Sequence, residues 1–591
     1  MAYKKDDLVT LTIEDIGAGG EGIGKADGYT VFVKDTVIGD VVEAKIIKAK
    51  KNYGYARLIR VVKPSDVRVE AVCPVAKQCG GCQLQHMSYE AQLRFKEKLV
   101  KNNVERIGGL REGSYVLEPI IGMDSPFRYR NKAQYPVGYN RENELVCGFY
   151  AGRTHYIVDC GDCVLGAEEN AEILEIIKAW MKEENIYAYN EETTSGIIRH
   201  ILIRTACHTD EIMVCLIVNA NEGDYRYASW QELPAKGELN RTVMGKLVDK
   251  LSLISGMSSI MINYNTKKTN VILGDTCDTL WGRAYIEDYI GNIKYQISPL
   301  SFFQVNPQQT EKLYNKVLEY ASVKGGETVW DLYCGIGTIS LFLAGMAKKV
   351  YGVEIVPQAI EDARNNAKLN GINNAEFFVG KAEEVVPAFY DKMKAAAAAG
   401  DMEASRSINP DVIVVDPPRK GCEESLLETI IAMSPERIVY VSCDSATLAR
   451  DLKYLEANGY KTERVQPVDQ FGHTVHVETV VLLSHKKPDS HINIKVEFGE
   501  GEGKVPLKAI SERAEAYKPK ERVTYKMIKE YIEAKYGFKV HTAYIAEVKR
   551  DLGLPMYDAP NAVEELKWQR KHPTAEKVEA IKDALTHFGA I

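Results

Sequence analysis

Short apolar strands alternate with helical segments in the second half of the chain, and this alternation narrows the possible folds more than any other feature. The expected strands are Thr328–Leu332, Lys349–Val353, Ala375–Val379, Val412–Val415, Arg437–Val441 and Val477–Leu483. Strands that are separated by helices usually pair in parallel and are buried on both faces of their sheet. From about Ile297 the sequence therefore predicts an α/β domain with a Rossmann-like parallel sheet.

The chain has 591 residues, which is more than one domain with a single hydrophobic core usually contains. The remainder of the chain also has other patterns. Near the N-terminus, Val42, Ala44 and Ile46 alternate with charged residues, and glycine turns separate the short strands, which predicts a small β-barrel. We expect four domains: an OB-like barrel at 1–63, a mixed α+β region at 64–290, the α/β domain at 291–486 and a mostly helical extension at 487–591.

Several finer elements follow from the same patterns. We expect strands at Ile201–Arg204 and Ile212–Val218 and helices at Tyr89–Ile107, Tyr525–Tyr536 and Ala543–Arg550. The low-complexity segment 392–409 predicts an inserted helix or loop without an assigned role. The C-terminal extension fits either a winged-helix-like RNA module or a packing extension.

Composition limits the classes of protein. The apolar (45%) and charged (27%) fractions are those of a soluble globular protein, and no apolar run suits a signal peptide or a membrane helix. We therefore expect a cytoplasmic monomer without membrane contact, whose twelve cysteines are not paired in disulfides. Because the net charge is −7, any RNA site must be a local basic surface.

A glycine loop follows the first strand of the α/β domain, in the sequence TVWDLYCGIGTISLFLA from Thr328. Gly335 and Gly337 allow the backbone to pass close to a ligand, but the third glycine of a dinucleotide fingerprint is missing. Asp331 at the strand end suits a cationic or hydroxyl-bearing ligand. Glu354 ends the next strand and suits a ribose diol, so S-adenosylmethionine (SAM) fits better than NAD.

Two further strands end in chemically distinctive residues. Asp416 begins DPPRKG, a sequence similar to the motif with which nucleic-acid methyltransferases hold their substrate. Cys443 ends the next apolar strand, in VSCDSATLARD. Without its neighbours, Cys443 would be interpreted as an ordinary buried cysteine.

Together, five motifs resemble the RNA uracil-5-methyltransferase family over about residues 295 to 485. They are SFFQVN (301–306), DLYCGIGT (331–338), DPPRKG (416–421), VSCDSATLARD (441–451) and HVETV (476–480). The resemblance implies Cys443 as nucleophile, Glu478 as base, and a cofactor site that includes Gln304, Tyr333, Gly335, Glu354 and Asp416. Cys334 in the glycine loop has no such role, and Ser445 stands where the family usually has proline.

The chemistry of uracil explains why this family needs a cysteine and a base. Carbon C5 of uracil becomes nucleophilic only after a thiolate has added to C6. A base must then remove the C5 proton so that the thiol can leave.

A cysteine cluster precedes the α/β domain. Cys73, Cys79 and Cys82 have the spacing C-x5-C-x2-C, and Cys160 and Cys163 follow later. Two CxxC pairs fit zinc, whereas three cysteines with a distant fourth fit a [4Fe–4S] cluster. The latter spacing resembles the 23S rRNA uracil-5-methyltransferases, which implies Cys73, Cys79, Cys82 and Cys163 as ligands, with Cys160 as an additional cysteine.

Possible RNA contacts lie in both the barrel and the central region. The barrel resembles a TRAM domain, and one of its edges combines Tyr53 and Tyr55 with Lys45, Lys48, Lys50, Lys51, Arg57 and Arg60. In the central region the candidates are Arg128, Arg130, Lys132, Arg199 and Arg204. The alternative for both sets is an ordinary solvated or salt-bridged surface.

These observations predict an enzyme that makes 5-methyluridine in RNA, with 23S rRNA as the favoured substrate. The barrel and the cysteine cluster favour rRNA, because by resemblance the bacterial tRNA-specific relatives typically lack both. Methylation of tRNA is the nearest alternative. A non-catalytic RNA-binding or chaperone protein is the alternative of another class. The target uridine must leave its base stack to reach Cys443, so a loop or single strand is expected.

Overall fold

The computed structural model describes residues 3–152, 154–222, 243–400, 410–486, 525–552, 554 and 572–588. They belong to two compact units, residues 1–487 and 488–591. The second unit contains α12 (Tyr525–Tyr536), α13 (Thr542–Asp551) and α14 (Ala575–His587), which share a small apolar core. Both helices expected here are confirmed, whereas much of the extension and the end of segment 392–409 lie outside the described residues. The expected boundaries at 63, 290 and 486 stay predictions.

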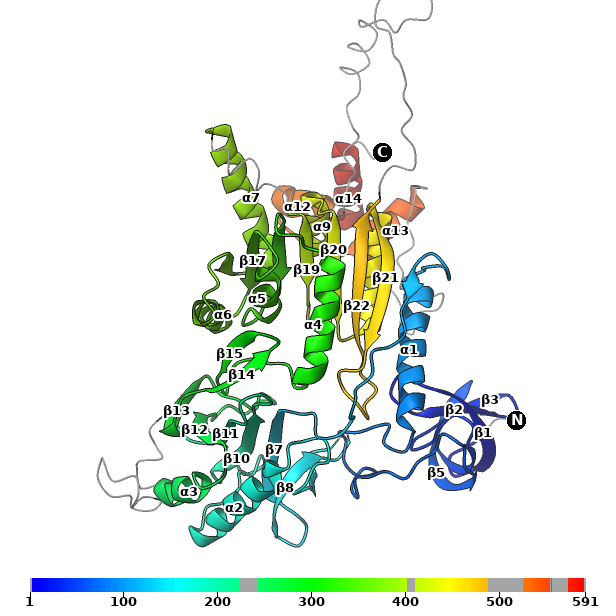
Figure 1. The fold of residues 1–591 in the computed structure, drawn as a ribbon. Helices are drawn as coiled ribbons and strands as arrows, with labels where there is room; N and C mark the ends of the chain where they lie inside the picture. Colours follow the sequence, from blue (N-terminus) through cyan, green and yellow to red (C-terminus); the bar gives the residue numbers. More distant parts are fainter. Residues whose placement is uncertain are drawn as a thin grey trace, which may run out of the picture. The chain divides into compact units, whose positions relative to one another are not determined.

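Five strands close into a barrel near the N-terminus (Figure 1, blue). In barrel order they are β1 (Leu8–Ile16), β2 (Gly22–Ala26), β3 (Tyr29–Val33), β5 (Tyr53–Lys63) and β4 (Val41–Ala49). Alternate residues point inward, so that Val31, Val42 and Ile46 are fully buried. The expected small barrel is thus confirmed.

An eight-stranded sheet forms the α/β half of the first unit, and we call it the catalytic sheet because it carries the expected catalytic residues. Its order is β18 (Ala375–Val379), β17 (Lys349–Glu354), β16 (Thr328–Leu332), β19 (Val412–Val415), β20 (Arg437–Ser442), β22 (Glu478–His485), β21 (Tyr460–Val468) and β6 (Val116–Leu117). The strands from β18 to β20 are parallel, and β22 is antiparallel to both of its neighbours. All six expected strands are present, with ends shifted by at most two residues.

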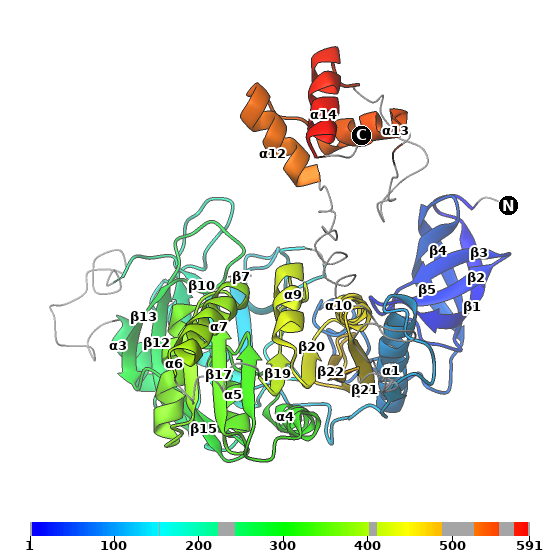
Figure 2. The ribbon, with the colours of Figure 1, turned by 90° about the horizontal axis from the view of Figure 1, so that it is seen from above.

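Helices cover both faces of this sheet (Figure 2). One face packs against α4 (Pro307–Ala321), α5 (Thr338–Ala344) and α6 (Pro357–Leu369). The other face packs against α7 (Ala382–Ala398), α9 (Glu424–Met433) and α10 (Ser445–Ala457). The strand order reverses at β16, because β17 follows on one side and β19 on the other. Such a reversal leaves a crevice at the carboxyl ends of the two flanking strands, where ligands bind.

A seven-stranded sheet lies between the barrel and the catalytic sheet in the sequence. Its order is β13 (Thr276–Gly282), β12 (Met257–Tyr264), β11 (Ile212–Val218), β10 (Ile198–Thr205), β7 (Lys132–Tyr139), β8 (Leu145–Tyr150) and β9 (Ile157–Asp159). One face packs on α2 (Glu169–Glu183) and α3 (Val243–Leu251). The opposite face shares a core with α4 and with the hairpin of β14 (Ile286–Ile290) and β15 (Ile293–Ile297).

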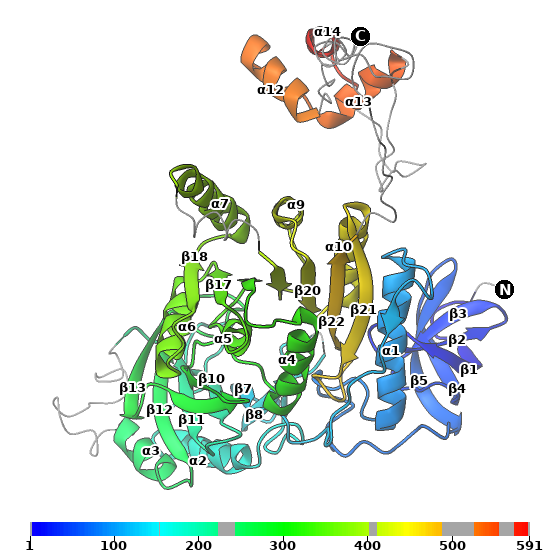
Figure 3. The ribbon, with the colours of Figure 1, turned by 45° about the horizontal axis from the view of Figure 1, so that its top comes forward.

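Helix α1 (Tyr89–Arg106) connects the barrel to the catalytic sheet (Figure 3). Its first half places Ala91 and Phe95 in the barrel core. Its second half places Val100 and Val104 in the core beneath α10. One helix therefore fixes the barrel against the catalytic half of the same unit.

Candidate active site

The residues that the family resemblance implies for catalysis and for the cofactor line a single cleft of about 1340 Å³. They are Gln304, Tyr333, Gly335, Glu354, Asp416, Cys443 and Glu478. Five of them lie at or just beyond the carboxyl ends of β16, β17, β19 and β20. The parallel sheet thus brings together residues that are more than 100 positions apart in the chain.

The glycine loop after β16 is held in an unusual backbone conformation. Tyr333, Gly335 and Gly337 all have positive φ, at 69°, 55° and 80°. A Cβ on Gly337 would lie 3.1 Å from the Phe377 ring, so this position also requires a close approach. The Gly335 amide donates to Glu354 Oε2 over 3.3 Å, which fixes the loop against the end of β17.

Asp331 does not face the cleft, contrary to the expectation that it meets the ligand. Its side chain is fully buried within β16, and Ser340 donates a hydrogen bond of 2.5 Å to its Oδ2. Burial raises the pKa of Asp331 to about 7, and this exceeds the opposing effect of the Ser340 hydrogen bond. Asp331 therefore ties β16 to α5, whereas Glu354 at the end of β17 lines the cleft.

The turn that carries Cys443 is organised by its neighbours. Ser442 Oγ accepts from the Asp444 amide, and the Asp444 carboxylate caps α10 by accepting from the amides of Ala446 and Thr447. The position that differs from the family, Ser445, accepts a hydrogen bond of 2.8 Å from Asn103 of α1. A side-chain bond thus ties down the turn at the position where relatives usually have proline.

Strand register places Cys443 beside Glu478. Ser442 of β20 pairs with Thr479 of β22 in antiparallel register, so the next position brings Cys443 opposite Glu478. Both residues line the cleft.

Burial perturbs the acid–base behaviour of the cleft. It raises the pKa of Glu478 to about 8, with a further increase from Asp416 and an opposing effect from Arg419. It also raises the pKa of Asp416 to about 6. The pKa of the Cys443 thiol rises to about 11 because of burial and of the charges of Glu478 and Asp416, while Arg419 lowers it.

Cys334, the other cysteine near the cleft, is packed in the core. It is buried, and a Cβ added at Gly352 would lie 2.9 Å from its sulfur. Burial raises the pKa of the Cys334 thiol well above its usual range. These properties suit packing and not nucleophilic attack.

The lining residues that were not singled out from the sequence include Phe302, Arg419, Phe471 and His476. Arg419 follows Pro417–Pro418, and its guanidinium lies 3.5 Å from His476 Nε2. Phe302 is exposed although its ring is large and apolar. The signal for Arg419, His476 and Phe302 was their position inside the quoted motifs, whereas nothing in the sequence marked Phe471.

Two arginines of the central region are structural, contrary to the expectation that they face RNA. Arg199 is buried and donates to the carbonyl oxygens of Asn265 and Lys267. Arg204 is buried and donates to the carbonyl oxygen of Ser301 over 2.5 Å. Arginines can satisfy backbone carbonyls in this way because the guanidinium has five donors.

The other three candidates of this group differ in their surroundings. Arg128 makes an ion pair with Asp162. Burial and the charge of Arg204 lower the pKa of Lys132 to about 7. Arg130 lies 5.9 Å above the ring of Phe471, next to the cleft.

The cysteine-rich segments lie against each other. The Gly80 amide donates to the carbonyl oxygen of Tyr150, and Cys79 forms an isolated bridge with Ala151. The thiol of Cys160 interacts with those of Cys73 and Cys163. Among the residues described, no group of three or more His, Cys, Asp or Glu side chains is placed to hold a single metal ion.

Comparisons with known proteins identify the family of this chain. A family model described as tRNA (uracil-5-)-methyltransferase matches residues 259–486, and a TRAM domain model matches residues 7–59. An uncharacterized RNA methyltransferase of Halalkalibacterium halodurans is 49% identical over 482 residues, which cover 82% of this chain and 98% of that protein. The chain belongs to the tRNA (uracil-5-)-methyltransferase family. It is a SAM-dependent RNA methyltransferase that acts on C5 of uracil.

Further relatives support the same assignment. An uncharacterized RNA methyltransferase of Clostridium tetani is 48% identical, covering 82% of this chain and 97% of that protein. The solved tRNA (uracil-54, C5)-methyltransferase of Pyrococcus abyssi, in complex with S-adenosyl-L-homocysteine, is 27% identical with a TM-score of 0.61. The match covers 80% of this chain and 99% of that protein. In the described part of this family member, no helix is long and apolar enough to cross a membrane.

Proposed function

We propose that this methyltransferase forms 5-methyluridine in 23S rRNA through a covalent adduct between Cys443 and C6 of the target uracil. The observation that carries the proposal is the placement of Cys443 opposite Glu478 in one cleft with the expected cofactor residues. Atoms C5 and C6 are bonded neighbours in the ring, so a nucleophile and a base on adjacent strands can act on the same uracil.

The reaction needs one bond-forming step at each carbon. The Cys443 thiolate adds to C6, and the electron pair that reaches C5 attacks the methyl group that SAM would supply. The bond from that methyl group to sulfur breaks, its electron pair stays on sulfur, and S-adenosylhomocysteine leaves. The Glu478 carboxylate then takes the C5 proton, the C5=C6 double bond forms again, and the thiolate leaves. Arg419 lowers the pKa values of Cys443 and Glu478, which burial raises. It therefore favours the ionised forms that the reaction needs.

The cofactor residues fit SAM by their chemistry. Glu354 binds the ribose hydroxyls through its two oxygens, which each retain a free lone pair after accepting from Gly335 or Val356. The open backbone at Gly335 lets the methionine part pass close to the loop, since no atom lies within 4 Å of its Cβ position. Gln304, Tyr333 and Asp416 complete the lining.

We propose that Cys73, Cys79, Cys82 and Cys163 hold a [4Fe–4S] cluster. The support is the C-x5-C-x2-C spacing and the contact of this segment with residues 147–163. In a [4Fe–4S] cluster each cysteine thiolate binds a different iron atom, so the four thiolates do not surround one ion. Bound iron and sulfide would supply a cross-link between the two segments, and the methyl transfer requires no electron from it. Zinc in the two CxxC pairs remains the alternative.

The barrel offers a surface that suits unpaired RNA bases. The rings of Phe32, Tyr53 and Tyr55 lie within 5.4 to 5.8 Å of one another on neighbouring strands, and both tyrosines are exposed. Exposed cations surround them, including Lys48 on β4. Lys45 and Arg60, by contrast, are paired with acidic residues. Aromatic rings among cations are typical of single-strand binding.

The choice of 23S rRNA over tRNA rests on the barrel and the cysteine cluster. In its favour, both features resemble the rRNA-specific enzymes. In favour of tRNA is the similarity to the tRNA (uracil-54, C5)-methyltransferase of Pyrococcus abyssi. A non-catalytic RNA-binding or chaperone role is the remaining alternative. In that case Cys443 and Glu478 would have no chemical role.

Substitution of uridine by 5-fluorouridine separates these alternatives. The purified protein is mixed with SAM and either 5-fluorouridine-containing 23S rRNA fragments or tRNA, and the products are run on a denaturing gel. Fluorine cannot leave as a proton, so the adduct should persist with the rRNA alone. A persistent adduct with tRNA alone would contradict the rRNA assignment. Absence of any adduct, with SAM bound, would contradict the reaction.

A further inference from the structure

One face of α1 carries polar side chains that the reaction does not use. Tyr89, Gln92 and Lys96 recur at helical spacing, and Gln92 and Lys96 are fully buried. All three donate to or accept from the loop 469–477, which joins β21 to β22. The helix and the loop are about 380 positions apart in the sequence, so this contact is made only by the fold.

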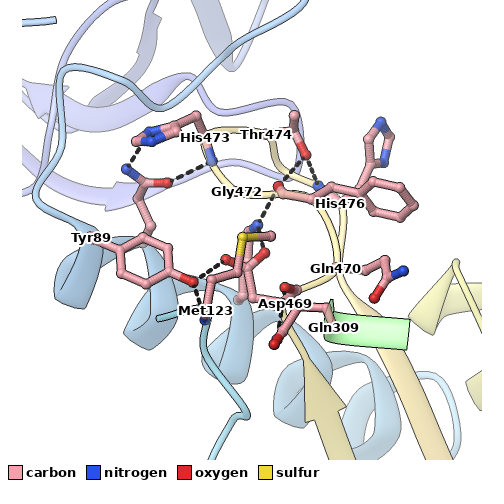
Figure 4. A network of polar contacts seen from close by, with 12 residues as sticks. Tyr89, Met123, Gln309, Asp469, Gln470, Gly472, His473, Thr474 and His476 are labelled. Atoms are coloured by element: carbon pink, nitrogen blue, oxygen red, sulfur yellow. Dashed lines mark hydrogen bonds and ion pairs between the residues drawn. The ribbon is translucent and has the colours of Figure 1, made fainter. Parts of the chain in front are cut away.

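The first contact is a buried ion pair at the start of the loop. Lys96 Nζ lies 2.5 Å from Asp469 Oδ1, and both side chains are fully buried. Lys96 also donates to the carbonyl oxygen of Phe471 over 2.9 Å. The Tyr89 hydroxyl donates to Asp469 Oδ2 and accepts from the Met123 amide, each over 2.7 Å (Figure 4). The Asp469 carboxylate thus has a partner for each oxygen.

The second contact fixes the middle of the loop. Gln92 accepts from the His473 amide over 3.0 Å, and its own amide group lies 3.2 Å from His473 Nδ1. The carbonyl oxygen of His473 accepts from the amides of Gln83 and Leu84, which directly follow Cys82. His473 has a positive φ of 65°, which is uncommon for a residue with a side chain. This conformation therefore depends on the surrounding hydrogen bonds.

The loop held in this way forms one wall of the active site. Phe471 and His476 line the cleft with Cys443, and the loop leads directly into Glu478. Asp469 follows Val468, which is the strand partner of Glu478. A shift of the loop would therefore move the side chains that surround the target base, whereas the cofactor residues on β16, β17 and β19 would stay in place.

We propose that Tyr89, Gln92 and Lys96 are positioning residues, which hold the loop 469–477 in the shape that admits the target uracil to Cys443. This inference rests on the proposed function. It predicts that loss of these contacts slows adduct formation but leaves SAM affinity unchanged. Burying a charged pair costs free energy, and apolar residues of similar size often stabilise a fold equally well. The buried charges of Lys96 and Asp469 therefore suit a positioning role better than a role in stability alone.

The test compares variants of the full chain by three measurements: melting temperature, SAM affinity and the rate of adduct formation at saturating 5-fluorouridine RNA. Y89F removes one hydroxyl, and Y460F is its control, because Tyr460 makes a similar buried hydrogen bond to Pro435 at the far end of β21. We expect Y89F to form the adduct about fivefold more slowly, because the hydroxyl's hydrogen bonds with Asp469 and Met123 are lost. Y460F should form it at the wild-type rate.

The charge pair needs a double variant, because K96M alone leaves Asp469 buried without a counter-charge and can fail to fold. K96M/D469N restores neutrality and should recover most of the melting temperature, yet its adduct rate should stay about tenfold below wild type. R68M, which breaks the similar pair between Arg68 and Asp40 in the barrel, is the stability control.

The outcomes separate the two proposals. Wild-type adduct rates in Y89F and in K96M/D469N would overturn the positioning role. Equal slowing in R68M and Y460F would do so as well, since it would assign the effect to general stability. An absence of adduct in the wild-type protein would instead overturn the proposed function.

Discussion

Cys443 and Glu478 lie opposite each other at the ends of two antiparallel strands, one residue beyond the pair formed by Ser442 and Thr479. Cys443 is the first residue after β20 and Glu478 is the first residue of β22. In the proposed reaction their side chains act on the same flat ring, Cys443 at C6 and Glu478 at C5. In the proposed mechanism, the antiparallel strand β22 thus supplies the base that acts beside Cys443.

The role of Cys443 predicts a selective loss of activity. C443A should lose methyl transfer completely and bind SAM with nearly wild-type affinity, because the thiol is needed only for addition to C6. C334A is the matched control and should retain methylation. Incorporation of labelled methyl groups into RNA and calorimetric SAM titration measure the two properties. Methylation by C443A would remove the nucleophile assignment.

The role of Glu478 predicts an arrested intermediate on ordinary RNA. E478Q can form the adduct and transfer the methyl group, but it cannot remove the C5 proton. A methylated protein–RNA adduct should therefore accumulate, and a denaturing gel would detect it. Loss of the negative charge should also lower the pKa of the Cys443 thiol below about 11, which pH-dependent alkylation of the Cys443 peptide measures. Full turnover by E478Q would assign the base elsewhere.

The raised pKa values predict the pH dependence of the reaction. Cys443 (pKa about 11) and Glu478 (pKa about 8) must both lose a proton. The logarithm of the rate should rise with a slope of about 2 below pH 8 and about 1 above it. R419M should move this change of slope, the break in the profile, to higher pH, because Arg419 lowers the pKa of Glu478. The measurement is tritium release from 5-tritiated uridine RNA in single turnover.

K420M is the control for R419M, since Lys420 is exposed and paired with Glu423. The account would be contradicted by a rate that falls with pH between 6 and 9. It would also be contradicted by an equal shift of the break in both variants.

The cysteine cluster predicts a coloured protein. Anaerobically purified protein should have the broad visible absorbance of a [4Fe–4S] cluster, and C79S should lose it. C207S is the control, because Cys207 is exposed and lies outside the cysteine-rich segments. Absorbance together with iron and sulfide analysis checks the prediction. Colourless wild-type protein with one zinc per chain would favour the zinc alternative.

Loss of the aromatic rings on the barrel surface should weaken RNA binding without changing the rate of the chemical step. Y53A/Y55A should raise the KM for RNA about tenfold or more, since each stacked base contributes about 1 to 3 kcal/mol. The kcat value should be unchanged. L8A removes an exposed apolar side chain from β1 and should leave KM at the wild-type value. Equal KM values in all three proteins would exclude the ring cluster from the RNA interface.

The sequence predicted the catalytic sheet well because its strands are apolar on both faces and end in motif residues. It did not predict β21, where charged residues such as Glu463 and Arg464 interrupt the apolar pattern, or β6, which has two residues. Asp331 was assigned to the ligand because a strand end does not reveal which side a carboxylate faces.

Long-range partners were also beyond the sequence. Nothing near Arg204 in the chain indicated that the carbonyl oxygen of Ser301 would accept from its guanidinium. Likewise, nothing near Lys96 in the chain indicated that Asp469 would lie beside it. Pairing across hundreds of residues depends on the packing of whole elements and not on local pattern.

The most direct test of the central claim is to identify the residue that is bonded to the trapped RNA. The 5-fluorouridine adduct is formed with SAM, digested with protease and nuclease, and sequenced by mass spectrometry. The account predicts a peptide in which Cys443 carries a uracil with both methyl and fluorine on C5. A modified Cys334, or a Cys443 peptide without the nucleotide in a sample that contains the adduct, would contradict it.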